Sequence, residues 1–283
     1  MNTNSNIFYM LEFLLLFLYN KNMKRYFVFT DVHGHYDVLM KALKTKGFKA
    51  SNTSHYIMSL GDNFDRGDKS VEIYNFLKKQ ARKGRAILLK GNHELLLKTA
   101  LEKKRISTLD ECNGLLMTIE EYRDINLLDD VDDALIHMNK EGWLKFIDEM
   151  GWYYRLGNYI FTHSWVPYDT LLEIAYFSND EWHDAVWDDG PTRYGEDNVF
   201  KRTKLTIVNG HRFSWMYKIR YEEKYKKYQF LDLSEFPPEL YTPFRGEHII
   251  ALDACSEYSN RVNILIFDEY DDGRVVLNSE LSD

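Results

Sequence analysis

The sequence has little of several features that would assign a protein class directly. It has 2 cysteines and 5 prolines in 283 residues, and its 36 basic side chains are outnumbered by 44 acidic ones. Two cysteines exclude a disulfide framework and favour a reducing, cytoplasmic compartment. The net charge of −8 argues against a nucleic-acid-binding protein, whose surface is usually basic. A Gly-rich Walker loop is missing, which disfavours nucleotide-driven phosphoryl transfer.

The N-terminal stretch also lacks what a membrane segment needs. Residues 7–19 read IFYMLEFLLLFLY, which is apolar but interrupted by Glu12 and shorter than the roughly 20 residues of a spanning helix. We therefore expect no stable membrane insertion, and expect residues 1–22 to be an extension outside a single domain of residues 23–283. A helix lying on a membrane surface is the alternative, disfavoured because its polar face would carry little charge.

The first hundred residues alternate between short β-rich runs and helical patterns. Strands are predicted at 26–30, 55–60 and 86–89, and helices at 36–46 and 70–83. This alternation predicts parallel strands joined by right-handed crossovers in an α/β fold. Every polar cluster of this region directly follows a strand, at the edge where open α/β sheets bind ligands.

The rest of the chain divides into a helical part and a β-rich part. Residues 95 to about 150 are charged, Leu-rich and without strand patterning, so we expect a helical insertion that forms a cap over the site. Strands are predicted again at 159–162, 205–208, 249–252, 262–267 and 274–277.

Five short clusters carry chemistry: DVHG from Asp31, GDNFDRG from Gly61, GNHE from Gly91, and the pairs Thr162-His163 and Gly210-His211. Oxygen and imidazole ligands of this kind suit divalent Mn, Fe and Zn. The six candidate ligands exceed what one tetrahedral zinc ion requires. They fit two metal ions that share a carboxylate, an arrangement that activates water for attack on phosphorus. Each histidine taken alone would more often be a core residue; the convergence of all five clusters favours a metal site.

The order and placement of these clusters resemble the successive motifs of the calcineurin-like metallophosphoesterases, and within them the phosphoprotein phosphatase family. The resemblance covers about residues 24–267, and only the motifs are specific. It implies a four-layer α/β/β/α sandwich with a helical cap insertion. It also implies two divalent metal ions, most simply Mn²⁺, with Fe/Zn, Co²⁺ and Ni²⁺ as alternatives.

The resemblance also implies a role for each motif residue. Asp31 and His33 would bind the first metal and Asp62 would bridge both. The second metal would be bound by Asn92, His163 and His211. The family usually has Gly where this chain has Thr30, and the metal assignment does not depend on that position.

Three further residues would carry the catalytic step. The resemblance implies that His93 is the general acid for the leaving oxygen and that Asp65 fixes its tautomer. Arg66, with Asn92 and His93, would bind the substrate phosphate. The family usually supplies a second phosphate-binding arginine, for which Arg193 and Arg202 are the nearest candidates.

The sequence leaves the substrate open. The main expectation is a phosphomonoesterase similar to serine/threonine protein phosphatases, acting on phosphoproteins or phosphopeptides through metal-bound hydroxide. The alternative is a dinucleoside polyphosphate hydrolase, in which Trp165 or Trp215 would line the pocket and stack on a base. A non-catalytic binding module is disfavoured, because no ligand and no catalytic histidine is missing.

Overall fold

The structure is a computed structural model that describes residues 23–167, 177–196 and 203–278. The predicted extension 1–22 and the candidate Arg202 lie outside the described residues. In the part of the chain that is described, none of the helices has the length and apolarity needed to cross a membrane.

The first half of the chain builds one sheet, joined by the last two strands. Its order is β10-β9-β1-β2-β3, in which β1, β2 and β3 are parallel and β9 pairs antiparallel to β1. The strands are β1 (Lys24–Phe29), β2 (His55–Ser59), β3 (Ala86–Leu88), β9 (Leu265–Glu269) and β10 (Val275–Leu277). The predicted strand at 262–267 is therefore displaced toward the C-terminus by two to three residues.

A second sheet follows in the order β4-β5-β6-β8-β7, with β5, β6 and β8 parallel. Its strands are β4 (Tyr153–Leu156), β5 (Tyr159–Thr162), β6 (Thr206–Asn209), β7 (Phe244–Gly246) and β8 (Ile249–Ala251). The sequence patterns predicted β5, β6 and β8 and missed β4 and β7, which both pair antiparallel at the edges of the sheet.

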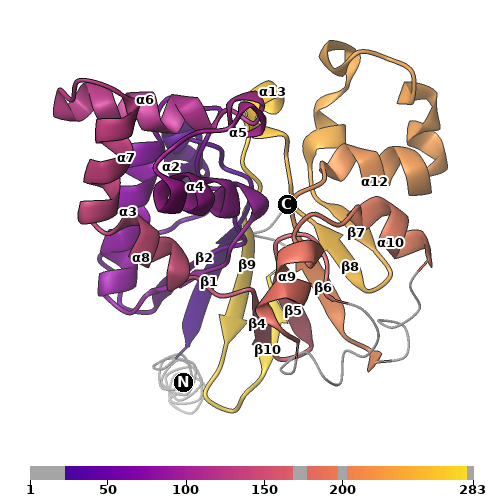
Figure 1. The fold of residues 1–283 in the computed structure, drawn as a ribbon. Helices are drawn as coiled ribbons and strands as arrows, with labels where there is room; N and C mark the ends of the chain where they lie inside the picture. Colours follow the sequence, from indigo (N-terminus) through magenta and orange to yellow (C-terminus); the bar gives the residue numbers. More distant parts are fainter. Residues whose placement is uncertain (1–22, 168–176, 197–202, 279–283) are drawn as a thin grey trace, which may run out of the picture.

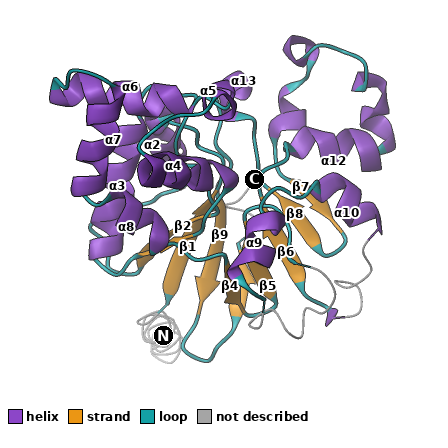
Figure 2. Cartoon of the chain, in the orientation of Figure 1, coloured by secondary structure: helices purple, strands orange, loops and turns teal. Residues whose placement is uncertain are grey.

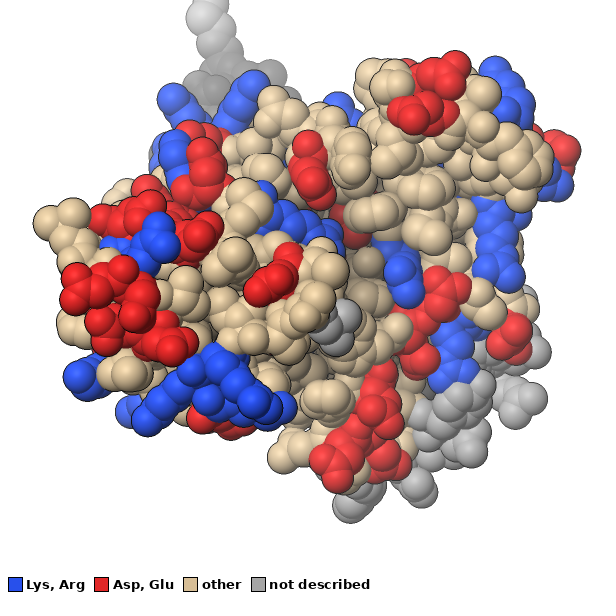
Figure 3. Space-filling model, turned by 45° about the horizontal axis from the view of Figure 1, so that its top comes forward, with Lys and Arg blue, Asp and Glu red and all other residues tan. Residues whose placement is uncertain are grey.

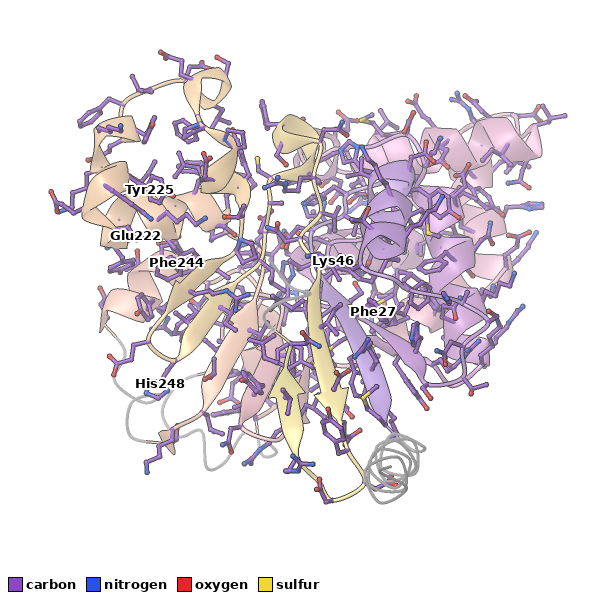
Figure 4. All side chains as sticks on the ribbon, turned by 180° about the vertical axis from the view of Figure 1, so that it is seen from behind. Phe27, Lys46, Glu222, Tyr225, Phe244 and His248 are labelled. Atoms are coloured by element: carbon purple, nitrogen blue, oxygen red, sulfur yellow. The ribbon has the colours of Figure 1, made fainter. Side chains whose placement is uncertain are left out.

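The two sheets pack face to face between two helical layers (Figures 1 and 2). Side chains of β1 alternate between two cores: Tyr26 and Val28 face the second sheet, whereas Phe27 and Phe29 face the helices. On the second sheet Phe244 packs toward the opposite helical layer, and Figure 4 shows Phe27 and Phe244 on opposite sides of the molecule. The predicted four-layer α/β/β/α architecture is confirmed.

Helices of the first half cover the first sheet. They are α2 (Tyr36–Thr45), α3 (Ser70–Arg82), α4 (Asn92–Lys103), α5 (Thr108–Cys112), α6 (Leu115–Asn126), α7 (Val131–Lys140) and α8 (Trp143–Asp148). The region 95 to about 150, where a helical insertion was expected, consists of helices. These helices pack beside α3, where the ring of Trp143 stacks on that of Tyr74 with centroids 3.8 Å apart. Gly114 and Thr118 of this region form hydrogen bonds with the loop after β2. That it caps bound substrate stays a prediction.

The outer face of the second sheet is covered by helices that the sequence patterns did not predict. These are α9 (Asn179–Ala185), α10 (Gly190–Glu196) and α12 (Ser214–Tyr221). Short helical turns follow: η2 (Glu223–Tyr228), η3 (Leu233–Glu235), η4 (Pro238–Tyr241) and α13 (Ser256–Ser259).

Candidate metal centre and active site

The five polar clusters converge at one end of the two sheets. They follow β1, β2, β3, β5 and β6, which run parallel within their sheets, so that their carboxyl ends meet at a common edge. The first sheet brings Asp31, Asp62 and Asn92, and the second brings His163 and His211. Two groups of potential ligands result: His33, Asp62 and His93 form the first, and Asp62, His163 and His211 form the second. The ligand atoms of each group lie within 4.8 Å of one another, and Asp62 belongs to both.

The first group is built around His33. Its Nδ1 lies 3.2 Å from the carbonyl oxygen of Phe64, and that contact turns Nε2 toward the carboxylates. Nε2 is 3.9 Å from Oδ1 of Asp31 and 3.7 Å from Oδ2 of Asp62. A histidine held through one nitrogen by a carbonyl presents the other as a ligand, which is the usual arrangement at metal sites.

The second group is built around Asn92. Its Oδ1 lies 3.0 Å from Nε2 of His163 and 2.9 Å from Nδ1 of His211. Nε2 of His163 is also 3.4 Å from Oδ2 of Asp62, and its Nδ1 lies 3.0 Å from the carbonyl oxygen of Leu60. The predicted bridging residue, Asp62, therefore lies between the two groups.

These residues fit two divalent metal ions. Asp31, Asp62, Asn92 and His163 are almost fully buried, and a buried carboxylate needs a compensating positive charge. In addition, Nε2 of His211 is buried without a hydrogen-bond partner among the described residues. The mixture of imidazole, carboxylate and amide ligands suits Mn, Fe or Zn.

The electrostatics of the cluster reflect this crowding of buried groups. Burial raises the pKa of Asp31 to about 6. Burial acts in the same direction on Asp62, but the imidazoles of His163 and His93 outweigh it and hold the pKa of Asp62 well below its usual range. Burial lowers the pKa of His211 to about 3, with His163 acting in the same direction. The cluster thus balances charge internally, as sites that bind ions commonly do.

The backbone of the site is strained. Asp31, His33, Asp62, Asp65 and Arg66 all have φ between 45° and 73°, a region that non-glycine residues rarely adopt. The loops after β2 and β3 also approach each other closely here: a Cβ atom on Gly61 would lie 2.5 Å from the backbone nitrogen of Gly91. Such clusters of strained residues are typical of functional sites.

Beside the candidate metal ligands lies a buried histidine–aspartate pair. Nδ1 of His93 is 2.8 Å from Oδ2 of Asp65, whose Oδ1 accepts a hydrogen bond of 2.8 Å from the hydroxyl of Thr118. Arg66 contacts two histidines of the first ligand group, with Nη2 3.0 Å from Nε2 of His93 and Nη1 3.3 Å from Nε2 of His33. Burial lowers the pKa of His93, but Asp62 and Asp65 outweigh it and the net pKa is raised.

Glu94 is a positioning residue that the motif contained but to which sequence reasoning gave no role. It is fully buried, and its Oε2 accepts hydrogen bonds of 2.8 Å from the backbone of Asp62 and of Gly91. Its Oε1 accepts from the backbone and the side chain of Asn63. One carboxylate thereby ties the loop after β2 to the loop after β3. The sequence signal was its place directly after the predicted metal ligand Asn92 and the predicted general acid His93.

Thr30, the departure from the family pattern, takes part in the site. Its hydroxyl donates a hydrogen bond of 2.6 Å to Oδ2 of Asp31. The same side chain packs against Gly210, where a Cβ atom would overlap both Thr30 and Asp31. The substitution thus leaves the ligand loop intact and adds a hydrogen bond to its carboxylate.

The structure also places Arg193 and the two tryptophans that were expected to line a substrate pocket. Arg193 forms an ion pair with Asp188 at 3.3 Å, and its role as a second phosphate-binding residue stays a prediction. The expectation that Trp165 lines a substrate pocket is wrong, because the side chain is 1% exposed in the core of the second sheet. Trp215 is half-buried and lines a cavity of about 420 Å³. Trp187, which sequence reasoning missed, lies beside His211 with ring centroids 6.4 Å apart.

Comparison with known proteins decides the family. Residues 24–242 match the calcineurin-like phosphoesterases. The chain belongs to this family. It is therefore a phosphoester hydrolase of the metallophosphoesterase type.

Individual relatives and structures agree with this assignment. A symmetrical bis(5′-nucleosyl)-tetraphosphatase of Pasteurella multocida is 26% identical over 67% of this chain and 70% of its own. A protein of the same name from Haemophilus influenzae is 24% identical over 69% and 72%. A serine/threonine phosphatase from Saccharomyces cerevisiae is similar in fold, with a TM-score of 0.54, 13% identity and coverage of 92% and 80%. At that identity the structural likeness concerns the fold alone.

Proposed function

We propose that this metallophosphoesterase hydrolyses dinucleoside tetraphosphates into two nucleoside diphosphates at a centre of two divalent metal ions. The observation that carries the proposal is the pairing of this site with relatives named symmetrical tetraphosphatases, which align over two thirds of both chains. The expected protein-phosphatase activity uses the same site chemistry but is supported only by likeness of fold.

The proposed metal ligands are Asp31 and His33 for one ion, Asn92, His163 and His211 for the other, and Asp62 for both. When bound, the two ions supply charge neutralisation and lower the pKa of water. We propose Mn²⁺ as the ion, with Fe/Zn, Co²⁺ and Ni²⁺ as alternatives.

Arg66 is the proposed phosphate-binding residue. Its guanidinium contacts His33 and His93, which both belong to the first ligand group, so it borders that group beside the histidine–aspartate pair. A planar guanidinium binds two non-bridging phosphate oxygens in a bidentate manner. When a phosphate engages Arg66, Nε2 of His93 is released from this contact and is free to carry a proton.

His93 is the proposed general acid. The water oxygen forms a bond to the β-phosphorus while the central P–O–P bond breaks, and Nε2 of His93 gives its proton to the departing diphosphate oxygen. Asp65 accepts a hydrogen bond from Nδ1 and stabilises the protonated ring beforehand. The proton lost by water leaves to solvent, from which His93 is reprotonated.

A direct substrate comparison tests the proposal. The protein is stripped with chelator, reloaded with Mn, Co, Ni, Zn or Fe, and supplied with diadenosine tetraphosphate or a phosphoserine peptide. We expect two ADP per diadenosine tetraphosphate and a kcat/KM at least tenfold above that for the peptide. Faster release of phosphate from the peptide would assign the site to protein dephosphorylation instead.

A further inference from the structure

One aromatic side chain is exposed directly beside the proposed second metal group. The ring of Trp187 lies edge-on to His211, with centroids 6.4 Å apart and an interplanar angle of 84°. Its side chain is 38% exposed. Of the six tryptophans, all of which belong to the described residues, only Trp187 has an exposed side chain. Exposure of a large aromatic surface at the edge of a polar site is typical of a binding site.

The loop that carries Trp187 connects α9 to α10 and is held by residues next to the metal ligands. Ser164, which follows His163, donates a hydrogen bond of 2.7 Å to the carbonyl of Asp188. Arg212, which follows His211, forms an ion pair of 3.3 Å with Asp189. The position of the Trp187 backbone is thus coupled to the same two strand ends that position the histidines.

The opposite side of this loop is fixed as well. The backbone nitrogen of Trp187 donates to the carbonyl of Asp184 at 3.0 Å, and Asp188 pairs with Arg193. An aromatic ring on such an anchored loop is pre-organised, so a flat ligand binds it without the cost of ordering a segment.

We propose that Trp187 stacks on a purine base of the substrate and thereby selects nucleotides over other phosphoesters. The inference deepens the proposed function and rests on it. An aromatic ring binds a base by stacking on its flat face, and phosphoserine has no such flat ring. Because the ring borders His211, the base it holds belongs to the nucleoside on the His163 and His211 side of the site.

Two substrates separate base recognition from phosphate chemistry: diadenosine tetraphosphate, and inorganic tripolyphosphate, which has no base. For Trp187→Ala we expect KM for diadenosine tetraphosphate to rise about tenfold, from the loss of one stacking contact. The effect on tripolyphosphate should be at least fivefold smaller. Trp187→Phe should restore most of the KM, whereas Trp187→Leu, which keeps apolar volume without a ring face, should resemble Trp187→Ala.

Binding provides a second readout. ADP added to the metal-loaded protein should quench tryptophan fluorescence, and Trp187→Phe should remove most of that quenching. Phe230→Ala is the matched control, because Phe230 is a 91% exposed aromatic outside the site and its loss should change neither substrate's KM.

The outcomes distinguish the two proposals. If the unmodified protein cleaves tripolyphosphate but not diadenosine tetraphosphate, the proposed function is wrong and this inference falls with it. If it cleaves diadenosine tetraphosphate and all Trp187 variants affect both substrates equally or not at all, the stacking role alone is wrong. If Trp187→Ala does not fold, the same criteria apply to Trp187→Leu and Trp187→Phe.

Discussion

In the proposed mechanism, the buried pair of His93 and Asp65 acts on the leaving group. Replacing His93 with asparagine keeps a polar side chain at this position but removes the ring nitrogen that would carry the proton, so this substitution tests the role. We expect His93→Asn to lower kcat by 10²–10⁴-fold, the usual contribution of a general acid, while the metal content stays unchanged. His137→Asn, at an exposed position of α7, is the control and should retain full activity. Full activity in His93→Asn would refute the acid role.

Glu94 acts on the site only through the backbone that it holds. In Glu94→Gln an amide NH₂ replaces one oxygen and opposes backbone N–H donors, which leaves buried donors unpaired. We expect a 10–100-fold loss of metal affinity, the usual effect of removing a partner that positions metal ligands. Metal titration by calorimetry measures it.

The control for Glu94 lies on the same helix. Glu102→Gln changes a half-exposed residue near the end of α4, and the metal affinity should stay within twofold of the unmodified protein. Equal affinities in the Glu94 and Glu102 variants would show that the carboxylate is not needed to position Asp62.

The two cysteines differ in environment and should differ in reactivity. Cys112 is exposed, whereas Cys255 is buried and burial raises the pKa of its thiol to about 12. Because the thiolate is the reactive form, a raised pKa leaves almost none of it at pH 8. We expect an aromatic disulfide reagent to titrate one thiol per native chain and two after denaturation. Two rapid reactions in the native protein would contradict the placement of Cys255 in the core.

At the scale of elements, sequence patterns predicted those whose burial is regular. β1 is recognisable as a short apolar run because its side chains are buried in cores on both faces, and the helices after β1 and β2 show helical spacing because each packs one face on a large core. Helix α12 escaped prediction because its buried face includes Lys218, whose ammonium donates to Thr242 and to the carbonyl of Glu239. β7 has three residues and depends on pairing with β8 rather than on its own pattern.

The displaced boundary of β9 has a similar cause. Pairing with β1 continues to Glu269, and Arg25 of β1 forms an ion pair of 2.7 Å with Asp268. Charged residues at the end of a strand conceal its extent in the sequence, because their partner lies in a strand more than two hundred residues away.

The helices of residues 92–148 belong to the first core, and an aromatic cluster contributes to their packing. Trp143 of α8 is fully buried, stacks on Tyr74 of α3 and meets Tyr122 of α6 edge-on. We expect Trp143→Ala to lower the free energy of unfolding by about 3–5 kcal/mol, the usual cost of deleting a buried large aromatic side chain. Urea unfolding measures it. Lys145→Ala, at an 80% exposed side chain of the same helix, should change it by less than about 0.5 kcal/mol.

At the scale of the whole molecule, the site depends on both sheets. Asp31 and Asp62 follow strands of the first sheet, Asn92 begins α4 just after β3, and His163 and His211 follow strands of the second sheet. The strand-end motifs predicted which side chains converge, because parallel strands place their carboxyl ends together. Thr118 and Trp187 were not predictable in the same way, since one lies in helix α6 and the other in the loop between α9 and α10, and the sequence does not reveal how these segments pack.

The surface of the molecule agrees with a small phosphorylated substrate. On the face drawn in Figure 3, acidic and basic side chains are interspersed over the helices rather than gathered in one broad basic stripe. In the proposed function, recognition would depend on the polar and aromatic groups at the strand ends rather than on a broad basic surface of the kind that binds nucleic acid.

In the proposed site, Asp62 is shared by two metal ions. Elemental analysis of metal-loaded protein tests it directly, with Asp62→Asn and Asn92→Ala measured beside the unmodified chain. We predict two ions per chain in the unmodified protein, about one in Asn92→Ala, and loss of both ions and of phosphoester hydrolysis in Asp62→Asn. A single ion in the unmodified protein, or hydrolysis that survives complete removal of metal, would contradict the account.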